Sequence, residues 1–241
     1  TFIGPGYSNQ EIEKRLKDLG AVFEVLDRED LIATCADALV AQHILGWFQG
    51  RMEFGPRALG ARSILADPRS PDMQSTLNLK IKFRESFRPF APAVLREDVA
   101  DWFNLEGDSP FMTLAVPVQE SRRFDLPENE RGLSGLEKVK ALRSQVPAVT
   151  HVDYSARIQT VDRNTNSLFH ELIAAFKART GCPMVINTSF NVRGEPIVCT
   201  PEEAFRCFMS TEMDSMAIGH CFLRKANQRP EDQEEFREFF K

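Results

Sequence analysis

The chain has 241 residues, 42% of them hydrophobic, and a formal net charge of −5 at pH 7. This length and apolar content can fill one large domain or two small ones, so we expect a globular protein with a substantial core. The acidic balance argues against general adhesion to nucleic acid and makes nucleic acid an unexpected partner.

Cysteine usage and hydropathy indicate where the protein works. The sequence has five cysteines and no C-x-x-C pair, a pattern that favours a reduced, cytoplasmic protein over a disulfide framework. No apolar run reaches the roughly 18 residues that a membrane span needs, so we expect no membrane partner.

The first third of the chain alternates helix and strand patterns. Ser8 and Glu11 form a capping box that predicts a helix ending at Gly20. Residues 22–26 alternate like a strand, residues 29–42 carry helical spacing, and residues 43–48 read as a second strand.

The segment 50–63 follows that strand and is rich in glycine and arginine. It contains three glycines and three arginines around one proline. Such a composition suggests a backbone that turns tightly beside an anion.

Further elements are predicted along the rest of the chain. Residues 119–135 are the most loop-like segment, and a mobile surface excursion is expected there. The predicted elements are a helix from Pro71 towards Leu79, strands at 90–95, 111–118, 156–161, 184–189 and 216–223, a helix at 166–180 ended by Gly181, and a helix capped by Thr200 and Glu203. After Lys225 we expect a charged tail with Phe236, Phe239 and Phe240 as possible helical anchors.

The strand 184–189 runs into the polar turn 187–196, which carries amide, hydroxyl and charged side chains. Open α/β sheets bind ligands at the carboxyl ends of strands. A second polar segment, 80–88, interleaves four cations with aromatic residues just before the strand at 90–95. Together with segment 50–63, these features make a cationic pocket for a small anionic ligand the leading hypothesis.

Simpler interpretations remain open for each segment. The turn after residue 187 could serve only to satisfy backbone groups, and the cations of segment 80–88 could form a solvated face. Arg84 could equally form a structural salt bridge to Glu85 or Glu53. Glu53 and Glu195 could each orient an arginine, bind a metal through water or contact a ribose. The four histidines show no metal-binding spacing, so no metal site built from a side-chain cluster is expected.

Four ordered motifs resemble those of a known family. They are Glu53–Leu65 (EFGPRALGARSIL), Lys82–Pro92 (KFRESFRPFAP), Ala156–Thr160 (ARIQT), and Asn187–Asn191 (NTSFN) with Gly194–Pro196 (GEP). The chain resembles the C-terminal half of the nodulation-type O-carbamoyltransferases, which include the tobramycin and cephamycin carbamoyltransferases. The resemblance spans residues 1–225.

The resemblance implies an α/β fold of the YrdC-like kind, a twisted mixed sheet with flanking helices and an open basic cleft. Residues 1–225 would form the carbamoyl-adenylate-forming domain, residues 1–20 would join it to a missing N-terminal actin-like domain, and residues 226–241 would form the charged tail. In that family ATP and carbamoyl phosphate give carbamoyl-adenylate with Mg²⁺, and the actin-like domain passes the carbamoyl group to an acceptor hydroxyl.

The family motifs also imply roles for individual residues. Lys82 and Arg88 are the expected catalytic cations, and Arg57, Arg157, Asn187 and Ser189 are the expected ligands of substrate and nucleotide. Further candidates are Arg62, Ser63, Arg84, Thr188, Asn191, Arg193 and Glu195. Cations of this kind would hold two anionic reactants together, since phosphoryl chemistry depends mainly on positioning and charge neutralisation.

Two other functions compete with this interpretation. A non-catalytic nucleotide- or RNA-binding module is the main alternative, because YrdC-like proteins include RNA binders. RNA binding would weaken steeply with salt, whereas carbamoyl-adenylate synthesis would release pyrophosphate only with carbamoyl phosphate present. An ATP-dependent kinase or ligase is weaker, because the sequence contains neither a P-loop nor a kinase glycine loop.

Overall fold

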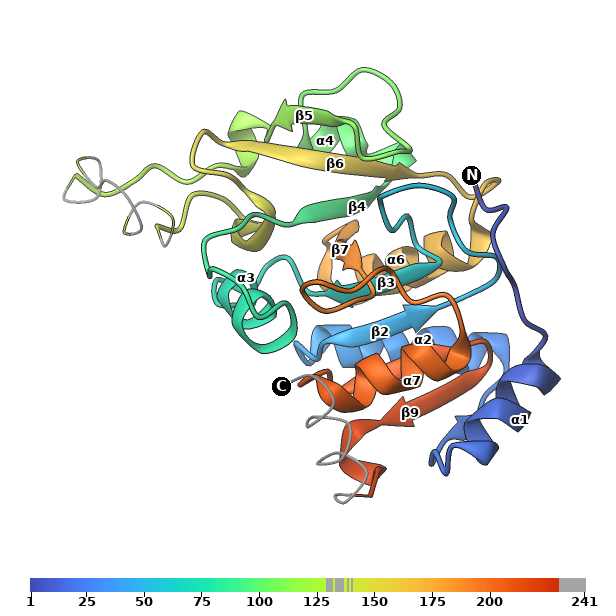
Figure 1. The fold of residues 1–241 in the computed structure, drawn as a ribbon. Helices are drawn as coiled ribbons and strands as arrows, with labels where there is room; N and C mark the ends of the chain where they lie inside the picture. The colour runs from blue at the N-terminus through green and yellow to red at the C-terminus, as the bar shows by residue number, and fades with distance from the viewer. Residues whose placement is uncertain (129–131, 133–136, 138, 140, 230–241) are drawn as a thin grey trace.

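The computed structural model of the protein describes residues 1–128, 132, 137, 139 and 141–229 (Figure 1). Among these residues, the strands form one sheet in the order β1-β9-β8-β2-β3-β7-β4-β6-β5. The pairs β2–β8 and β4–β6 are parallel, and the other neighbours are antiparallel. The predicted α/β class with a mixed sheet and flanking helices is therefore confirmed.

The bounds of the elements are as follows. The strands are β1 (Glu24–Val25), β2 (Leu45–Phe48), β3 (Arg62–Ala66), β4 (Ala91–Leu95), β5 (Leu114–Pro117), β6 (Ser155–Val161), β7 (Met184–Ser189), β8 (Ser215–Ile218) and β9 (Cys221–Arg224). Within the described residues, the α-helices are α1 (Asn9–Asp18), α2 (Arg28–Val40), α3 (Met73–Thr76), α4 (Val99–Trp102), α6 (Ser167–Thr180) and α7 (Pro201–Ser210).

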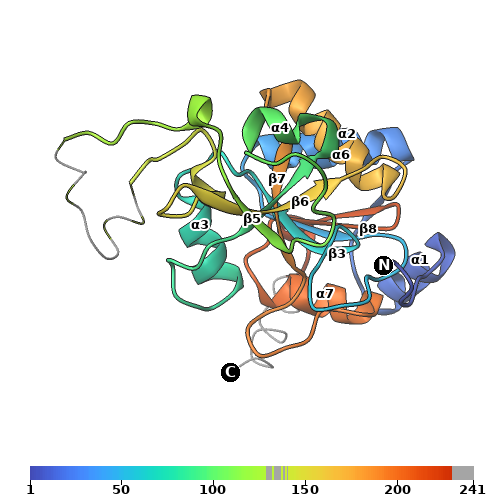
Figure 2. The same ribbon diagram turned by 90° about the horizontal axis from the view of Figure 1, so that it is seen from above.

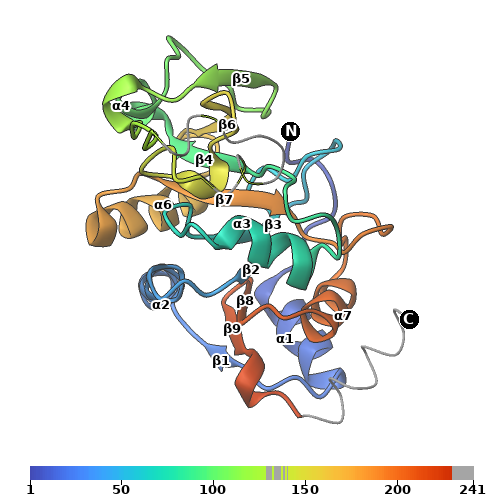
Figure 3. The same ribbon diagram turned by 90° about the vertical axis from the view of Figure 1, so that its left-hand side faces the viewer.

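Helices cover both faces of the sheet. In Figure 2 and Figure 3, α2 and α6 lie side by side on one face, whereas α1 and α7 lie on the other. Every residue of β2, β3 and β8 is accordingly buried, because the two faces of these strands both meet helices. The core includes the fully buried rings of Trp47, Phe169, Phe190 and Phe208.

Local signals predicted several helix ends correctly. The Ser8 hydroxyl accepts a hydrogen bond from the Glu11 amide, and the Glu11 carboxylate accepts one from the Ser8 amide, which confirms the first capping box. Thr200 and Glu203 cap α7 in the same way. Gly181 ends α6 with a φ of 75°, the left-handed conformation that glycine adopts without strain.

Other predictions need correction. The single strand predicted over residues 216–223 is wrong, because Gly219 turns the chain with a φ of 55° and β8 pairs back with β9. The helix predicted from Pro71 begins at Met73 and continues as a π-helix, Leu77–Ile81. Strand β3 begins inside the glycine-arginine segment, where no strand was expected.

The two segments that looked least ordered are only partly described. Residues 120–122 form a 3-10 turn at the start of the segment predicted as a loop, and part of the remainder lies outside the described residues. Gln228, in the expected tail, is buried, and its side-chain amide exchanges two hydrogen bonds with the Val22 backbone. The proposed anchors Phe236, Phe239 and Phe240 lie outside the described residues.

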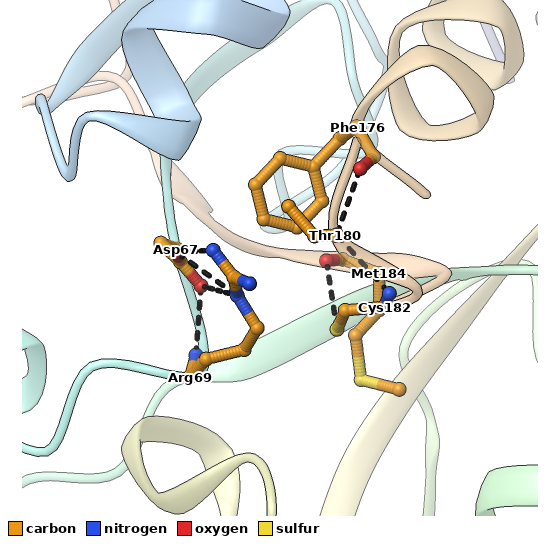
Figure 4. Close-up of polar contacts among 6 residues, drawn as sticks. All are labelled: Asp67, Arg69, Phe176, Thr180, Cys182 and Met184. Atoms are coloured by element: carbon orange, nitrogen blue, oxygen red, sulfur yellow. Dashed lines mark hydrogen bonds and ion pairs between the residues drawn. The ribbon is translucent and has the colours of Figure 1, made fainter. Parts of the chain in front are cut away.

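A paired arginine closes the end of the sheet where β3 stops and β7 starts (Figure 4). Asp67 is 1% exposed, and its carboxylate accepts hydrogen bonds from the Arg69 amide and from Nε and Nη2 of the same guanidinium. The guanidinium carbon lies 5.3 Å from the ring centroid of Phe176 in α6. Asp67 raises the pKa of Arg69, so this pair keeps both charges and satisfies them locally.

Candidate functional site

A hollow of about 230 Å³ opens at the opposite end of the sheet, where β7 ends and β4 and β6 begin. We call it the arginine pocket. The predicted site residues that line it are Arg57, Arg84, Arg157, Asn187, Thr188 and Ser189. They come from four separate segments, so the fold brings together side chains up to 132 positions apart in the sequence.

The loop between β2 and β3 holds Arg57 at the mouth of the pocket. Glu53 is 4% exposed, and its Oε1 accepts hydrogen bonds from the backbone amides of Leu59, Ala61 and Arg62 at 2.7, 2.7 and 3.2 Å. Glu53 Oε1 therefore holds the backbone of this loop in place. The sequence had left the role of this carboxylate open. The loop is fixed from inside while its tip, with Arg57, stays exposed.

A glycine makes this loop possible. Gly60 has a φ of 102°, and an added Cβ would lie 2.2 Å from the ring of Phe169. The Gly60 carbonyl accepts a hydrogen bond from the Trp47 indole at 3.0 Å. The close contact with the core therefore requires glycine at this position, and it holds the loop against the sheet.

Asn187 and Gln159 tie the same loop to the strands. Asn187 Nδ2 donates to the Ala58 carbonyl at 3.1 Å and to Gln159 Oε1 at 2.7 Å. Gln159 Nε2 in turn donates to the Leu59 carbonyl at 2.9 Å. Both side chains are buried, so they stabilise the pocket wall. Gln159 lies in one of the sequence motifs but was not among the predicted site residues.

Two pocket arginines lack a partner. Among the described residues, the side chains of Arg57 and Arg157 have no hydrogen-bond, ion-pair or ring partner. Arg157 projects from β6 at a position opposite Ala115 of β5, and both guanidinium side chains belong to exposed residues. The pocket therefore holds positive charge that the protein itself does not neutralise.

Arg84 contributes a third, partly buried cation. Its Nε donates to Asn78 Oδ1 at 2.7 Å, and its guanidinium carbon lies 5.1 Å from the ring centroid of Phe90. The suggested salt bridge from Arg84 to Glu85 or Glu53 does not form. Burial lowers the pKa of Arg84, and nearby Arg88 lowers it further.

Lys82 lies behind the turn after β7. It is 4% exposed, and its Nζ donates to the Ser189 carbonyl and, at 2.9 Å each, to the carbonyl and the side-chain Oδ1 of Asn191. Burial lowers the pKa of Lys82 to about 7. The ammonium group thus faces neutral oxygen atoms, and it fixes the turn that carries Ser189.

The remaining sequence candidates lie apart from the pocket. Arg88 has a side chain 52% exposed and pairs with Glu85 at 3.0 Å. Arg62 is fully buried, stacks 3.5 Å from the Phe48 ring centroid and donates to the carbonyls of Gln49 and Pro5. The Ser63 hydroxyl accepts a hydrogen bond from the Gly60 amide, Arg193 is exposed, and Glu195 lines a separate hollow beside Arg206.

A second hollow adjoins the arginine pocket and was not foreseen from the sequence. Its volume is about 520 Å³, and it shares Arg57 and Arg157 with the first. Phe54 and Phe111, which line it, are 77% and 52% exposed. The second hollow therefore combines exposed aromatic rings with the positive charge of Arg57 and Arg157.

The described residues contain neither a metal-binding cluster nor a membrane-spanning helix. No group of three or more His, Cys, Asp or Glu side chains there is arranged to hold a metal ion. None of the described helices has both the length and the apolar character required to cross a bilayer.

Comparison with known proteins assigns the chain to a family. The family model for the carbamoyltransferase C-terminus matches residues 36–225. The Synechocystis sp. protein sll1178 is 52% identical over 237 residues, covering 98% of this chain and 38% of that relative. The nodulation protein NolO of Bradyrhizobium diazoefficiens is 38% identical over 228 residues, covering 93% of this chain and 38% of the relative.

A relative with an enzyme name is also found. The 3'-hydroxymethylcephem-O-carbamoyltransferase of Amycolatopsis lactamdurans is 35% identical over 189 residues, covering 78% of this chain and 32% of the relative. The chain thus spans well under two thirds of the length of these relatives. On the family match and these identities, the chain belongs to the carbamoyltransferase C-terminus family.

Proposed function

We propose that this chain binds ATP and carbamoyl phosphate and joins them into carbamoyl-adenylate, releasing phosphate and pyrophosphate. The carbamoyl group would then pass to an acceptor hydroxyl bound in an actin-like domain of the same longer polypeptide. The observation that carries this proposal is the pair Arg57 and Arg157, two cations that share one hollow and have no partner among the described residues.

Electrostatics supports two anionic reactants in this place. Two unpaired guanidinium groups that share one hollow repel each other, and the arrangement becomes favourable when a polyanion lies between them. Planar guanidinium groups bind phosphate or carbamate through two parallel hydrogen bonds. ATP and carbamoyl phosphate repel each other in water, and arginines between them would remove that barrier.

The two adjoining hollows suggest how the reactants divide the space. Carbamoyl phosphate fits the polar arginine pocket, beside Ser189 and Thr188. The apolar neighbour, with Phe54 and Phe111, suits the nucleobase, because aromatic rings stack on bases whatever their sequence. Arg57 and Arg157 line both hollows, so the ATP phosphates would cross from one to the other there.

Lys82 and Arg88 take different parts in this proposal. Lys82 would hold the turn at Ser189 and Asn191 in position, and ligand binding would draw its ammonium group towards the phosphates. Arg88 would exchange its exposed partner Glu85 for a ligand phosphate, a low-cost exchange because exposed ion pairs contribute little. Both cations would therefore stabilise the charged transition state more than they stabilise the free protein.

Mg²⁺ would enter with ATP as part of the nucleotide substrate and would supply positive charge to neutralise the leaving pyrophosphate. Oxygen atoms of the nucleotide suffice as ligands for such a substrate-bound ion. We also propose a cytoplasmic location, which the five free cysteines support because reducing conditions preserve thiols.

Pyrophosphate release tests the proposal. The chain is incubated with Mg²⁺ and ATP, with and without carbamoyl phosphate, and we expect pyrophosphate only when both substrates are present. Arg157→Ala should lower this rate about 100-fold, the effect of losing roughly 3 kcal/mol of transition-state stabilisation, and Arg157→Lys should restore part of it.

The matched control is Arg163→Ala, which removes an exposed arginine that does not line either hollow. Its rate should equal that of the wild type. The proposed function would be refuted if the rate of pyrophosphate release did not depend on carbamoyl phosphate. Equal rates for the two alanine variants would refute it as well.

A further inference from the structure

His151 lines the arginine pocket and has no part in the function proposed so far. It stands on a tight turn just before β6, the strand that carries Arg157. Its amide donates to the Ser155 carbonyl at 2.8 Å, and its carbonyl accepts from the Tyr154 amide at 3.0 Å. Buried Arg143 also donates to that carbonyl, so the backbone beneath the imidazole is held from two sides.

A chain of hydrogen bonds sets the tautomer of this imidazole. The Ser155 hydroxyl donates its one proton to Asp153 Oδ1 at 2.7 Å. The same hydroxyl lies 3.2 Å from His151 Nδ1, so its oxygen can only accept there, and Nδ1 must carry the proton. Nε2, which has no hydrogen-bond partner among the described residues, is then the basic nitrogen of the neutral ring.

Burial and the charges around His151 favour the neutral imidazole. Burial lowers its pKa below the ordinary value, Asp153 opposes that shift, and Arg157 and Arg143 lower it further. Arg57 and Arg84 line the same pocket and add positive charge to its wall. A polyanion bound to these arginines would reverse the local field and raise the proton affinity of the imidazole.

We propose that His151 is the general base of the carbamoyl phosphate step and accepts a proton at Nε2 from the attacking water. This inference rests on the proposed function. The water oxygen bonds to phosphorus while one of its O–H bonds breaks, and that proton moves to Nε2. The bond from phosphorus to the carbamoyl oxygen breaks with its electron pair left on carbamate, so the products are carbamate, phosphate and an imidazolium.

The residues around the pocket fit this step. The carbamate is freed beside the arginines that hold the ATP phosphates, ready to attack the α-phosphorus. The imidazolium forms next to the phosphate product and can return its proton to it or to solvent. A positioned general base typically contributes 10²- to 10⁴-fold, which sets the size of the expected effect.

The first test compares two histidine variants by pH profile. His151→Asn removes the base and keeps a short side chain that can reach Ser155, and His43→Asn is the control because His43 is exposed and lines neither hollow. Wild type and His43→Asn should lose activity as pH falls through the His151 ionisation. His151→Asn should be about 100-fold slower and should lack that acid limb.

The second test addresses the hydrogen-bond chain and is independent of turnover. Nitrogen chemical shifts of labelled protein should report a proton on Nδ1 of His151 at neutral pH, and Ser155→Ala should shift the ring towards a mixture of tautomers. Inorganic phosphate should raise the pKa of this ring in the wild type. A ring protonated on Nε2, or one whose pKa ignores phosphate, would overturn the inference.

The outcomes separate this inference from the proposed function. If the wild type releases pyrophosphate with carbamoyl phosphate and His151→Asn keeps the wild-type rate and acid limb, the function stands and the role of His151 is refuted. If the wild type releases no pyrophosphate under any condition, the proposed function fails, and the proposed base fails with it.

Discussion

The two ends of the central sheet place arginine in opposite environments, one with a partner for the charge and one without. Where β3 ends, Arg69 lies near the Phe176 ring, and its backbone amide, Nε and Nη2 all donate to buried Asp67 (Figure 4). Where β6 begins, Arg157 shares a hollow with Arg57, and no described residue neutralises either. An arginine with a built partner supports the fold, whereas arginines left without one mark the place where a ligand supplies the negative charge.

Removal of both unpaired cations should affect activity and leave stability unchanged. The double variant Arg57→Ala with Arg157→Ala should lower carbamoyl-phosphate-dependent pyrophosphate release by about 10³-fold or more, since each contact contributes mainly in the transition state. Its free energy of unfolding should stay within about 0.5 kcal/mol of the wild type, because no folded-state contact is lost. Rate assays and urea unfolding measure the two quantities.

The reverse pattern is expected at the other end of the sheet. Arg69→Ala leaves the buried Asp67 carboxylate without its ion-pair partner and should lower the free energy of unfolding by about 3 kcal/mol. Asp67→Asn with Arg69→Ala removes the stranded charge and should recover part of that loss. Activity of the folded protein should remain within about threefold of the wild type in both.

A large loss of activity without loss of stability in Arg69→Ala would contradict the division between the two ends. So would a marked loss of stability in the double pocket variant.

The sequence predicted the members of the pocket better than their roles. Arg57, Arg157 and Ser189 were predicted as ligands of substrate and nucleotide from the family motifs, and the fold brings them to one hollow. Arg62 and Arg88 belong to the same motifs, yet one is stacked in the core and the other pairs on the surface. Neighbouring residues in the chain cannot show which cation will find a partner, because the partners come from distant segments.

His151 and Gln159 show what the sequence search overlooked. Metal-binding spacing was the criterion for the histidines, and it does not detect a single imidazole that pairs with Ser155, whose hydroxyl in turn donates to Asp153. A useful signal was available, since Asp153 lies in the turn before the motif with Arg157 and Ser155 follows that turn. Capping boxes, by contrast, were predictable because every interacting group lies within three residues.

Lys82 should make the free energy of unfolding depend on pH, since it is a buried cation whose hydrogen bonds go only to neutral oxygens. Burial lowers its pKa from 10.5 to about 7, so between these values the unfolded chain binds more protons than the folded one. The free energy of unfolding should therefore gain a positive contribution as pH rises through this window, by up to about 1.4 kcal/mol per pH unit. Lys82→Met should flatten the profile, which urea unfolding at several pH values would measure, and an unchanged slope would show that Lys82 keeps its ordinary proton affinity.

The smallest expected effect tests whether the periphery is independent of the pocket. Ser8→Ala removes the hydroxyl that caps α1, and loss of such a cap costs about 1 kcal/mol of unfolding free energy. Glu11 would lose the same hydroxyl as a partner but keep its bond to the Ser8 amide, so the helix should persist with a frayed first turn. Pyrophosphate release should not change, because Ser8 lines neither of the two hollows. A loss of activity larger than the loss of stability would contradict this independence. It would show that the N-terminal segment, which accepts hydrogen bonds from Arg51 and Arg62, helps to position the loop that carries Arg57.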